Sequence, residues 1–369
     1  MDVPFVDLSR QFNPLKAQLQ AALQSVIERC AFINGPEVKE FENRMARHSE
    51  LPEVCAVSNC THAIYLTLKA LGVGEGDQVI TVPNTAFPTS EAINLAGAQV
   101  VFADITAGSY ALDPKAAEQA ITKKTRAIIP VHLYGIPAQM DSFVELGKKY
   151  NLAVVEDAAQ AQGAGYKGRR VGAVGRAGCF SFFPSKNLGA FGDGGAVASG
   201  DGELIRKVRM AANHGREDKY THQFIGTNSR LDTLKAAQLS ICLEYLDQWN
   251  RERRSAADLY NELLSPYEEI IRPRVPDQCE AVWHVYVIRY KNRDKLAAFL
   301  NAQGIKTGLH YPLPLHLQPA YSYLGLPEGS LPEAEAACRE VLSLPMFPKI
   351  TPQEVEAVAK AIGQFLTKS

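Results

Sequence analysis

The sequence predicts an α/β fold with a mostly parallel central sheet that is flanked by helices. From about residue 54 to 200, short β-rich runs alternate with amphipathic helical stretches. The length of 369 residues and the hydrophobic content of 46% are typical of a globular chain with two lobes. We expect a large domain at residues 1–248 and a smaller C-terminal α+β domain at residues 249–369. This division allows the N-terminal helices to pack on the small domain.

Seven strands are expected in the large domain. The last two are too close in sequence for a helical crossover, so we expect them to form a local antiparallel pair. The expected strands are Val54–Val57, Gln78–Val82, Gln99–Ala103, Ala127–His132, Ala153–Glu156, Cys179–Phe183 and Ala196–Ser199.

A helix is expected between the first two strands. Ser58 and Asn59 can cap its start, Ile64 and Leu68 mark its apolar face, and Gly72 can end it with a positive φ. Because parallel sheets bind ligands outside the carboxyl ends of their strands, the start of this helix is a candidate ligand site.

The second lobe is expected to begin after a long helix over roughly Ser229–Trp249, continued by the charged segment Arg251–Arg254. Beyond it, Val282–Tyr290 reads as a strand and Tyr311–Pro319 as a proline-rich loop. Thr351, with Glu354 three residues later, forms a capping-box pattern that opens the last helix.

Composition and termini exclude several classes of function. The net charge of −1 gives no basic face for nucleic acid. The segment MDVPFVDLSR lacks the basic patch and apolar core of a secretory signal, and no apolar run reaches the roughly 18 residues that span a bilayer. The seven cysteines are scattered, without zinc spacing. We therefore expect a cytoplasmic protein without membrane, nucleic acid or metal.

Asp157 and Lys186 carry the most informative chemistry. Asp157 ends an apolar strand in V-V-E-D-A-A-Q, where an isolated carboxylate is costly unless it meets a cation such as a pyridinium nitrogen. A salt-bridged or helix-capping role is the alternative. Lys186 lies in S-F-F-P-S-K-N-L-G, before a glycine-rich turn, so its backbone is held and its amine could form a Schiff base. The alternative is an ordinary surface lysine.

A phosphate site is the third expected feature. Ser58-Asn-Cys-Thr61 lies where a strand passes into a helix, and backbone N–H groups at a helix N-terminus bind anions. The hydroxyl of Thr61 could assist, and Ser181 could add a second hydroxyl. Plain N-capping explains the same residues equally well, so the signal matters only together with Asp157 and Lys186.

Taken together, these motifs resemble the DegT/DnrJ/EryC1/StrS sugar aminotransferase family. The resemblance covers nearly the whole chain and is highly specific as a combination. The segments that carry it are F-V-D-L, N-G-P-E-V, V-E-D-A-A-Q, F-F-P-S-K-N-L-G, G-D-G-G, N-S-R-L-D, H-Y-P and S-L-P-M.

The resemblance implies a fold-type I enzyme dependent on pyridoxal 5'-phosphate, acting as a homodimer with shared active sites. Lys186 would form the Schiff base and Asp157 would pair with the pyridine nitrogen. Gln160 would lie beside the cofactor ring. The phosphate would be held by Thr61, Ser181 and Asn228, the last reaching across from the partner chain.

Three departures from the family pattern affect the expected site. Ala86 stands where many relatives have an aromatic residue that stacks on the cofactor, so Phe87 is expected to take over or the stacking is lost. Cys60 stands where relatives often have glycine, which predicts a slightly wider phosphate loop. Phe183 replaces a histidine common in enzymes that act at C4 of the sugar, which favours C3.

His310, Tyr311 and His316 match the region where relatives contact the nucleotide or sugar, so they are the expected substrate-binding residues together with Phe183. A hydrogen-bonded structural role is the alternative for the histidines. Trp283 and Tyr286 are expected in the core.

The resulting hypothesis is an aminotransferase that moves an amino group from L-glutamate to a keto-sugar of a dTDP- or UDP-linked hexose, at C3. The alternatives are a C4 aminotransferase, a sugar dehydratase of the same family, which Lys186 argues against, and a non-catalytic cofactor-binding sensor. The nucleotide, the deoxygenation state of the sugar and the final product stay open at this stage.

Overall fold

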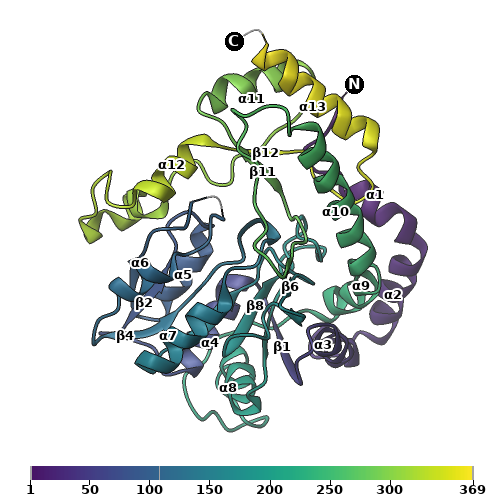
Figure 1. Ribbon diagram of the computed structural model, residues 1–369. Helices are drawn as coiled ribbons and strands as arrows, with labels where there is room; N and C mark the ends of the chain where they lie inside the picture. The colour runs from purple at the N-terminus through teal and green to yellow at the C-terminus, as the bar shows by residue number, and fades with distance from the viewer. Residues whose placement is uncertain (1, 108, 368–369) are drawn as a thin grey trace.

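The computed structural model describes residues 2–107 and 109–367. Its centre is a seven-stranded sheet in the order β1-β9-β8-β5-β4-β2-β3 (Figure 1). Strand β9 runs antiparallel to β1 and β8, whereas β8, β5, β4, β2 and β3 pair in parallel. The predicted α/β class and the antiparallel pair are thus confirmed. The strands are β1 Glu53–Val57, β2 Gln78–Thr81, β3 Gln99–Phe102, β4 Thr125–Ile128, β5 Ala153–Asp157, β8 Ala177–Ser181 and β9 Gly195–Ser199.

Helices cover both faces of this sheet because successive strand residues point to opposite sides. In β5, Val154 joins one hydrophobic cluster and Val155 joins the other. The first cluster includes α3 (Pro36–His48), α7 (Met140–Tyr150) and α9 (Thr233–Leu243), and the second includes α4 (Cys60–Ala70), α5 (Phe87–Leu95) and α8 (Gly202–Ala212). The remaining large-lobe helices are α1 Leu8–Phe12, α2 Lys16–Arg29 and α6 Pro114–Gln119.

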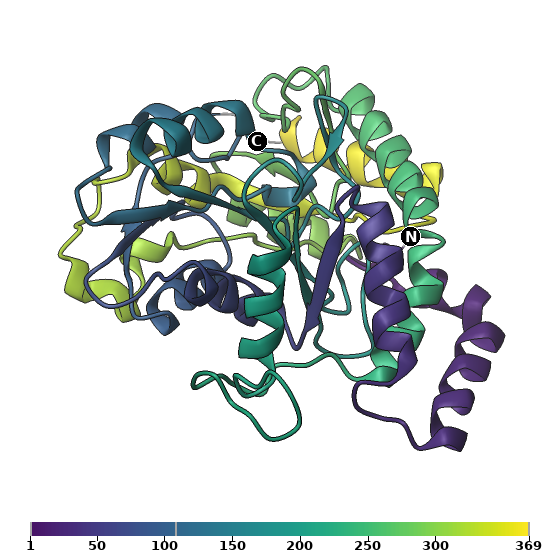
Figure 2. The ribbon, with the colours of Figure 1, turned by 90° about the horizontal axis from the view of Figure 1, so that it is seen from below.

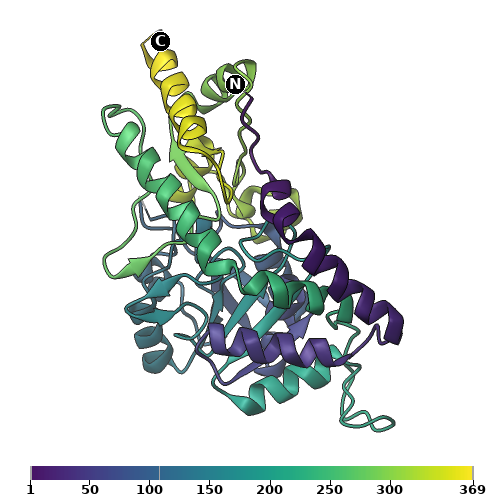
Figure 3. The same ribbon diagram turned by 90° about the vertical axis from the view of Figure 1, so that its right-hand side faces the viewer.

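A separate hydrophobic core lies in the C-terminal part of the chain, above the sheet in Figure 1. Its elements are α10 Leu246–Leu263, β11 Tyr286–Arg289, α11 Arg293–Ala302, β12 Val341–Leu344 and α13 Pro352–Leu366, with α12 Pro332–Glu340 beside them. Figure 3 shows α13 alongside α10. The capping box of Thr351 and Glu354 is present as predicted.

The N-terminus contributes to the C-terminal core. Val3 is buried there and exchanges backbone hydrogen bonds with Gly304 and Lys306. Arg10 pairs with Glu354 through both terminal nitrogens, at 2.7 Å each. The expected domain boundary after residue 248 stays a prediction, and α10 runs across it.

Three expectations about the second lobe were inaccurate. The long helix expected over Ser229–Trp249 is two helices, α9 and α10, separated at Glu244–Tyr245 without any glycine or proline to mark the break. The expected strand Val282–Tyr290 is only β11, because the amides of Val282 and His284 bond to the Tyr134–Gly135 turn. The loop expected at Tyr311–Pro319 contains a short 3₁₀ helix, Leu315–Leu317.

Two smaller features complete the fold. A three-stranded sheet joins β10 (Cys279–Glu280), β6 (Gly165–Tyr166) and β7 (Arg169–Arg170). Between α8 and α9 the chain forms a loop that projects from the body of the molecule (Figure 2). Within the described ranges, no helix is long and apolar enough to cross a membrane.

Candidate functional site

Three of the expected site residues, Asp157, Ser181 and Lys186, converge at the carboxyl ends of β5 and β8. Asp157 is the last residue of β5 and pairs with Cys179 of β8, while Ser181 ends β8 opposite Gly195 of β9. This is the edge at which parallel sheets bind ligands. The connection from β8 to β9 carries Lys186 over the same edge.

Asp157 is a buried carboxylate, only 4% exposed. Its oxygens accept hydrogen bonds from the Thr89 hydroxyl at 2.7 Å and from the Ala159 amide at 3.0 Å. Among residues 2–107 and 109–367, no ion pair joins Asp157 to a cation. A buried carboxylate without a cation is costly, so the arrangement fits a ligand that brings a protonated nitrogen.

Lys186 is held by its backbone, whose amide donates to the Phe183 carbonyl at 2.8 Å. Its Nζ lies 3.5 Å from Nε2 of His284. Burial disfavours the charged ammonium and lowers the pKa of Lys186 from 10.5 to about 8, although the carboxylate of Asp157 acts in the opposite direction. The amine is therefore unprotonated, and nucleophilic, far more often than that of a free lysine.

The lowered pKa predicts the pH at which Lys186 reacts. Acetylation of Lys186 in the full-length chain without added cofactor, followed by peptide mass spectrometry, should reach half its plateau rate near pH 8. An unperturbed lysine needs about pH 10.4. The folded chain binds this proton more weakly than the unfolded chain, so the contribution of Lys186 to stability increases as pH rises from 8 to 10.5. A midpoint above pH 10 would contradict the burial account.

An anion cup lies at the N-terminus of α4. The Asn59 side chain accepts the amide of His62 at 2.8 Å, which leaves the amides of Cys60 and Thr61 to face a ligand. The backbone of Asn59 packs directly on Gly195, and a Cβ at Gly195 would come within 2.5 Å of its carbonyl carbon. Since Gly195 pairs with Ser181 across β8 and β9, this contact sets the cup beside Ser181.

The close contact at Gly195 predicts a selective effect on anion binding. We expect Gly195→Ala to displace the start of α4 and to weaken binding of pyridoxal phosphate by roughly 10-fold or more. Gly200, five residues on, is the matched control, because a Cβ there meets nothing within 4 Å. Titration of both variants with the cofactor tests this. Equal affinities for the two variants would contradict it.

Gln160 connects the sheet edge to the C-terminal lobe. It is buried, accepts the amide of Tyr134 at 2.7 Å and donates to the hydroxyl of Tyr311 at 3.2 Å. Burial raises the pKa of Tyr311 to about 12. Next to it, Nδ1 of His310 forms a hydrogen bond of 2.8 Å with the Ser343 hydroxyl. Burial and the positive charge of Lys186 lower the pKa of His310 to about 4. His310 and Tyr311 thus lie in one group with Asp157, Gln160 and Lys186, called the Lys186 cluster below.

The other expected residues occupy different surroundings. Phe87 packs against Tyr321, with ring centroids 5.5 Å apart. Phe183 and Asn228 are exposed on this chain. His316 is buried, and its Nε2 lies 3.1 Å from Glu335 in the C-terminal lobe. The structure therefore gives His316 a partner outside the Lys186 cluster.

Two residues that contact the site were missed from the sequence. Thr89 caps the carboxylate of Asp157, and His284 meets the amine of Lys186. Thr89 had no signal, since threonines near a helix start are common. His284 stood between the aromatic residues Trp283 and Tyr286, which were expected in the core. Within the described part of the chain, no cluster of His, Cys, Asp or Glu is placed to hold a metal ion.

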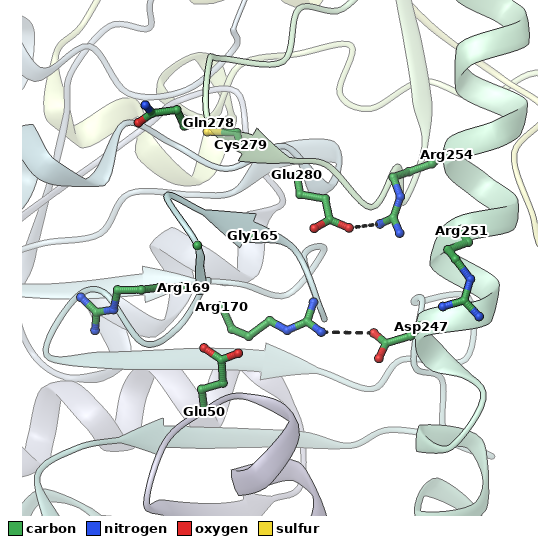
Figure 4. Close-up of a pocket in the computed structure, with 11 residues that line it drawn as sticks. Glu50, Gly165, Arg169, Arg170, Asp247, Arg251, Arg254, Gln278, Cys279 and Glu280 are labelled. Atoms are coloured by element: carbon green, nitrogen blue, oxygen red, sulfur yellow. Dashed lines mark hydrogen bonds and ion pairs between the residues drawn. The ribbon is translucent and has the colours of Figure 1, made fainter.

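A surface pocket of about 460 Å³ lies between α10 and the β6–β7 hairpin, and its lining includes none of the expected site residues (Figure 4). Its charges are largely matched. Arg254 pairs with Glu280 at 2.7 Å and Arg170 with Asp247 at 3.5 Å. We therefore locate the functional site at the sheet edge and not in this pocket.

Comparison with known proteins points to one family over nearly the whole chain. The profile of the DegT/DnrJ/EryC1/StrS aminotransferase family matches residues 13–363. The chain is 46% identical to a "pleiotropic regulatory protein" of Geobacillus stearothermophilus, over 99% of both chains. It is 43% identical to a dTDP-3-amino-3,4,6-trideoxy-alpha-D-glucose transaminase of Streptomyces venezuelae, over 98% of this chain and 96% of the relative.

Solved structures are similar throughout the chain. The S. venezuelae DesV structure, determined with a ketimine intermediate, superposes with a TM-score of 0.97 at 43% identity and covers 99% of this chain and 98% of its own. The NtdA structure from Bacillus subtilis, with the bound cofactor PMP, gives a TM-score of 0.93 at 31% identity over 99% and 85% of the two chains.

Proposed function

Because this chain belongs to the DegT/DnrJ/EryC1/StrS aminotransferase family, we propose that it moves an amino group from L-glutamate to C3 of a keto-hexose carried by dTDP or UDP. The observation that carries the proposal is the pair formed by a buried carboxylate without a cation, Asp157, and a lysine with a lowered pKa, Lys186. The two act on each other electrostatically at one sheet edge.

The residues present fit pyridoxal 5'-phosphate. Asp157 would hold the proton of the ring nitrogen, and the amides of Cys60 and Thr61 with the Ser181 hydroxyl would bind the phosphate. Gln160 would lie beside the ring. When bound, the cofactor supplies an electron sink for the bonds that are broken at carbon.

Lys186 would be the group that moves the proton between carbon atoms. Its pKa of about 8 lets it both take and return a proton near neutral pH, as a general acid and base must. The loop backbone fixes the position of Lys186, so little motion is needed between the two half-reactions.

The substrate side of the site is proposed from Phe183, His310 and Tyr311. Phe183 is 52% exposed on the loop that carries Lys186, where an apolar face can pack on a sugar. His310 and Tyr311 border the same cluster. Phe183 and the C3 activity named for the S. venezuelae relative both support C3. His316, being paired with Glu335, would position its loop and not touch the sugar.

We propose a homodimer in which Asn228 completes the phosphate site of the other chain. Asn228 is exposed on this chain, so a partner chain can reach its side chain. Large apolar side chains are also exposed, Ile225 completely, which favours a protein–protein contact. The cytoplasm fits seven cysteines that are all free thiols.

Mixing two inactive variants tests the shared site. A Lys186→Ala chain and an Asn228→Ala chain, unfolded and refolded together, should recover about a quarter of wild-type activity, because half of the random dimers have one intact site. Each variant refolded alone is the control. Recovery of no activity, with dimers present by sedimentation, would show that each chain builds its own site.

One alternative has support from a specific observation. The 46% identical relative is named as a regulatory protein, which fits a cofactor-binding sensor. The two functions differ in turnover. As an aminotransferase, the yellow protein should lose its long-wavelength absorbance with L-glutamate, release 2-oxoglutarate, and repeat the cycle when a keto-sugar nucleotide is supplied. A protein that changes colour once and never releases product repeatedly would be the sensor.

A further inference from the structure

His284 lies against the reacting amine. Its Nε2 is 3.5 Å from Nζ of Lys186, and the side chain is 9% exposed. Its other ring nitrogen, Nδ1, is buried and meets no hydrogen-bond partner in the described part of the chain. One nitrogen of the ring therefore faces Lys186, and the other makes no hydrogen bond to any residue that the structure describes.

The backbone fixes the distance between these two residues. The amide of Val282 donates to the carbonyl of Gly135 at 2.9 Å. A Cβ on Gly135 would lie only 3.0 Å from the backbone nitrogen of His284, so the two backbones pack closely. Next to Lys186, the Asn187 side chain donates to the Val282 carbonyl at 2.8 Å. The loop that carries Lys186 is thus bonded to the short segment 282–284, which carries His284.

Arg253 anchors that segment from α10. Its guanidinium is 2% exposed, and one terminal nitrogen donates to the carbonyls of Trp283 at 3.2 Å, His284 at 3.1 Å and Met346 at 3.2 Å. No carboxylate pairs with it among the residues that the structure describes. Burying a guanidinium without a carboxylate is costly, and the three carbonyls that Arg253 binds offset part of that cost.

The neighbouring arginines of α10 show the contrast. Arg254 pairs with Glu280, and Arg251 points into the open pocket beside Asp247 (Figure 4). Only the inward-facing Arg253 touches the segment next to Lys186.

His284 is neutral in this environment. Burial lowers its pKa well below the ordinary value, and the positive charges of Lys186 and Arg253, together with His310, act in the same direction. A neutral imidazole can form a hydrogen bond with an amine in either direction without adding a second charge.

We propose that His284 is a positioning residue that orients the amine of Lys186 through Nε2, and that Arg253 fixes His284 for this task. The inference rests on the proposed function, since Lys186 is the reactive lysine assigned there. It adds a requirement that this function does not contain, namely a polar atom at one defined place on the His284 side chain.

Three substitutions separate the two ring nitrogens. His284→Gln puts an amide where Nε2 lies, His284→Asn puts one where Nδ1 lies, and His284→Phe puts none. We measure the rate at which pyridoxal phosphate turns the cofactor-free chain yellow, and the acetylation rate of Lys186 without cofactor. His284→Asn and His284→Phe should slow both by about tenfold, whereas His284→Gln stays within about threefold.

The pH profile and a control complete the test. Because the pKa of His284 lies well below 6.5, His284→Gln should keep the shape of the wild-type profile between pH 6.5 and 8. His48→Gln, at a partly buried histidine paired with Asp247, should match wild type. The inference is overturned if all His284 variants react at the same rate, or if the Asn and Gln variants lose rate equally. Those are the results that a role in packing alone predicts.

The two proposals fail in distinguishable ways. If the wild-type chain never turns yellow, the proposed function fails, and the acetylation rates alone decide the role of His284. If wild type turns yellow and the His284 variants do not separate, only the positioning role fails. If His284→Phe does not fold, the Asn and Gln pair decides.

Discussion

Replacing Lys186 by alanine should lower kcat by roughly 10⁴-fold, because the amine is the only group proposed to move protons between carbons. Its position next to His284 and its pKa of about 8 support that role. The measurement is glutamate-dependent turnover of the variant and of wild type. In addition, wild type is reduced with borohydride in the presence of pyridoxal phosphate, and mass spectrometry of the peptide that contains Lys186 shows whether the cofactor has been attached to it.

Lys360 provides the matched control. It is exposed on α13, far along the chain from the sheet edge, so Lys360→Ala should leave turnover unchanged. A Lys186→Ala chain that binds cofactor and still turns over at the wild-type rate would remove Lys186 from the mechanism.

Replacing Asp157 by asparagine should lower kcat by about 10²–10³-fold, the loss typical of one preorganised electrostatic partner. The asparagine oxygen can accept the Ala159 amide while its NH2 group donates to the Thr89 hydroxyl, which can act in either direction, so both contacts of the carboxylate keep a partner. The asparagine cannot hold a proton on a ring nitrogen as a carboxylate does. The measurement is turnover at saturating cofactor, with the cofactor spectrum recorded as a function of pH.

Asp113→Asn is the control for this substitution. Asp113 is the N-cap of α6 and accepts the Lys115 amide at 2.9 Å, a task that asparagine performs as well. Wild-type kcat in Asp157→Asn, with the cofactor bound, would contradict the assigned role of the carboxylate.

Much of the large lobe could be predicted because its signals are local. Apolar runs alternating with helical patterns identified the strands, and the short connection between β8 and β9 identified the antiparallel pair. Asp157, Lys186 and the start of α4 could be found for a related reason. Their chemistry is unusual for strand ends and loops, and parallel strands bring such ends together.

The contacts that come from elsewhere in the chain could not be predicted. His284 reaches Lys186 only because Arg253 and Gly135 dock its segment, and these contacts join residues that are distant in sequence. Likewise, the break between α9 and α10 has no glycine or proline, so helical periodicity runs straight through it. The pairing of His316 with Glu335 is a tertiary contact of the same kind.

The proposed transfer of an amino group between glutamate and C3 of a nucleotide-linked hexose is tested most directly by running the reaction in reverse. The purified chain, loaded with pyridoxal phosphate, is incubated with 2-oxoglutarate and matched 3-amino and 4-amino hexoses on dTDP and UDP. We predict that a 3-amino sugar is consumed while L-glutamate forms in equal amount. Glutamate formation from the 4-amino sugars alone, or from none of the four, would contradict the account.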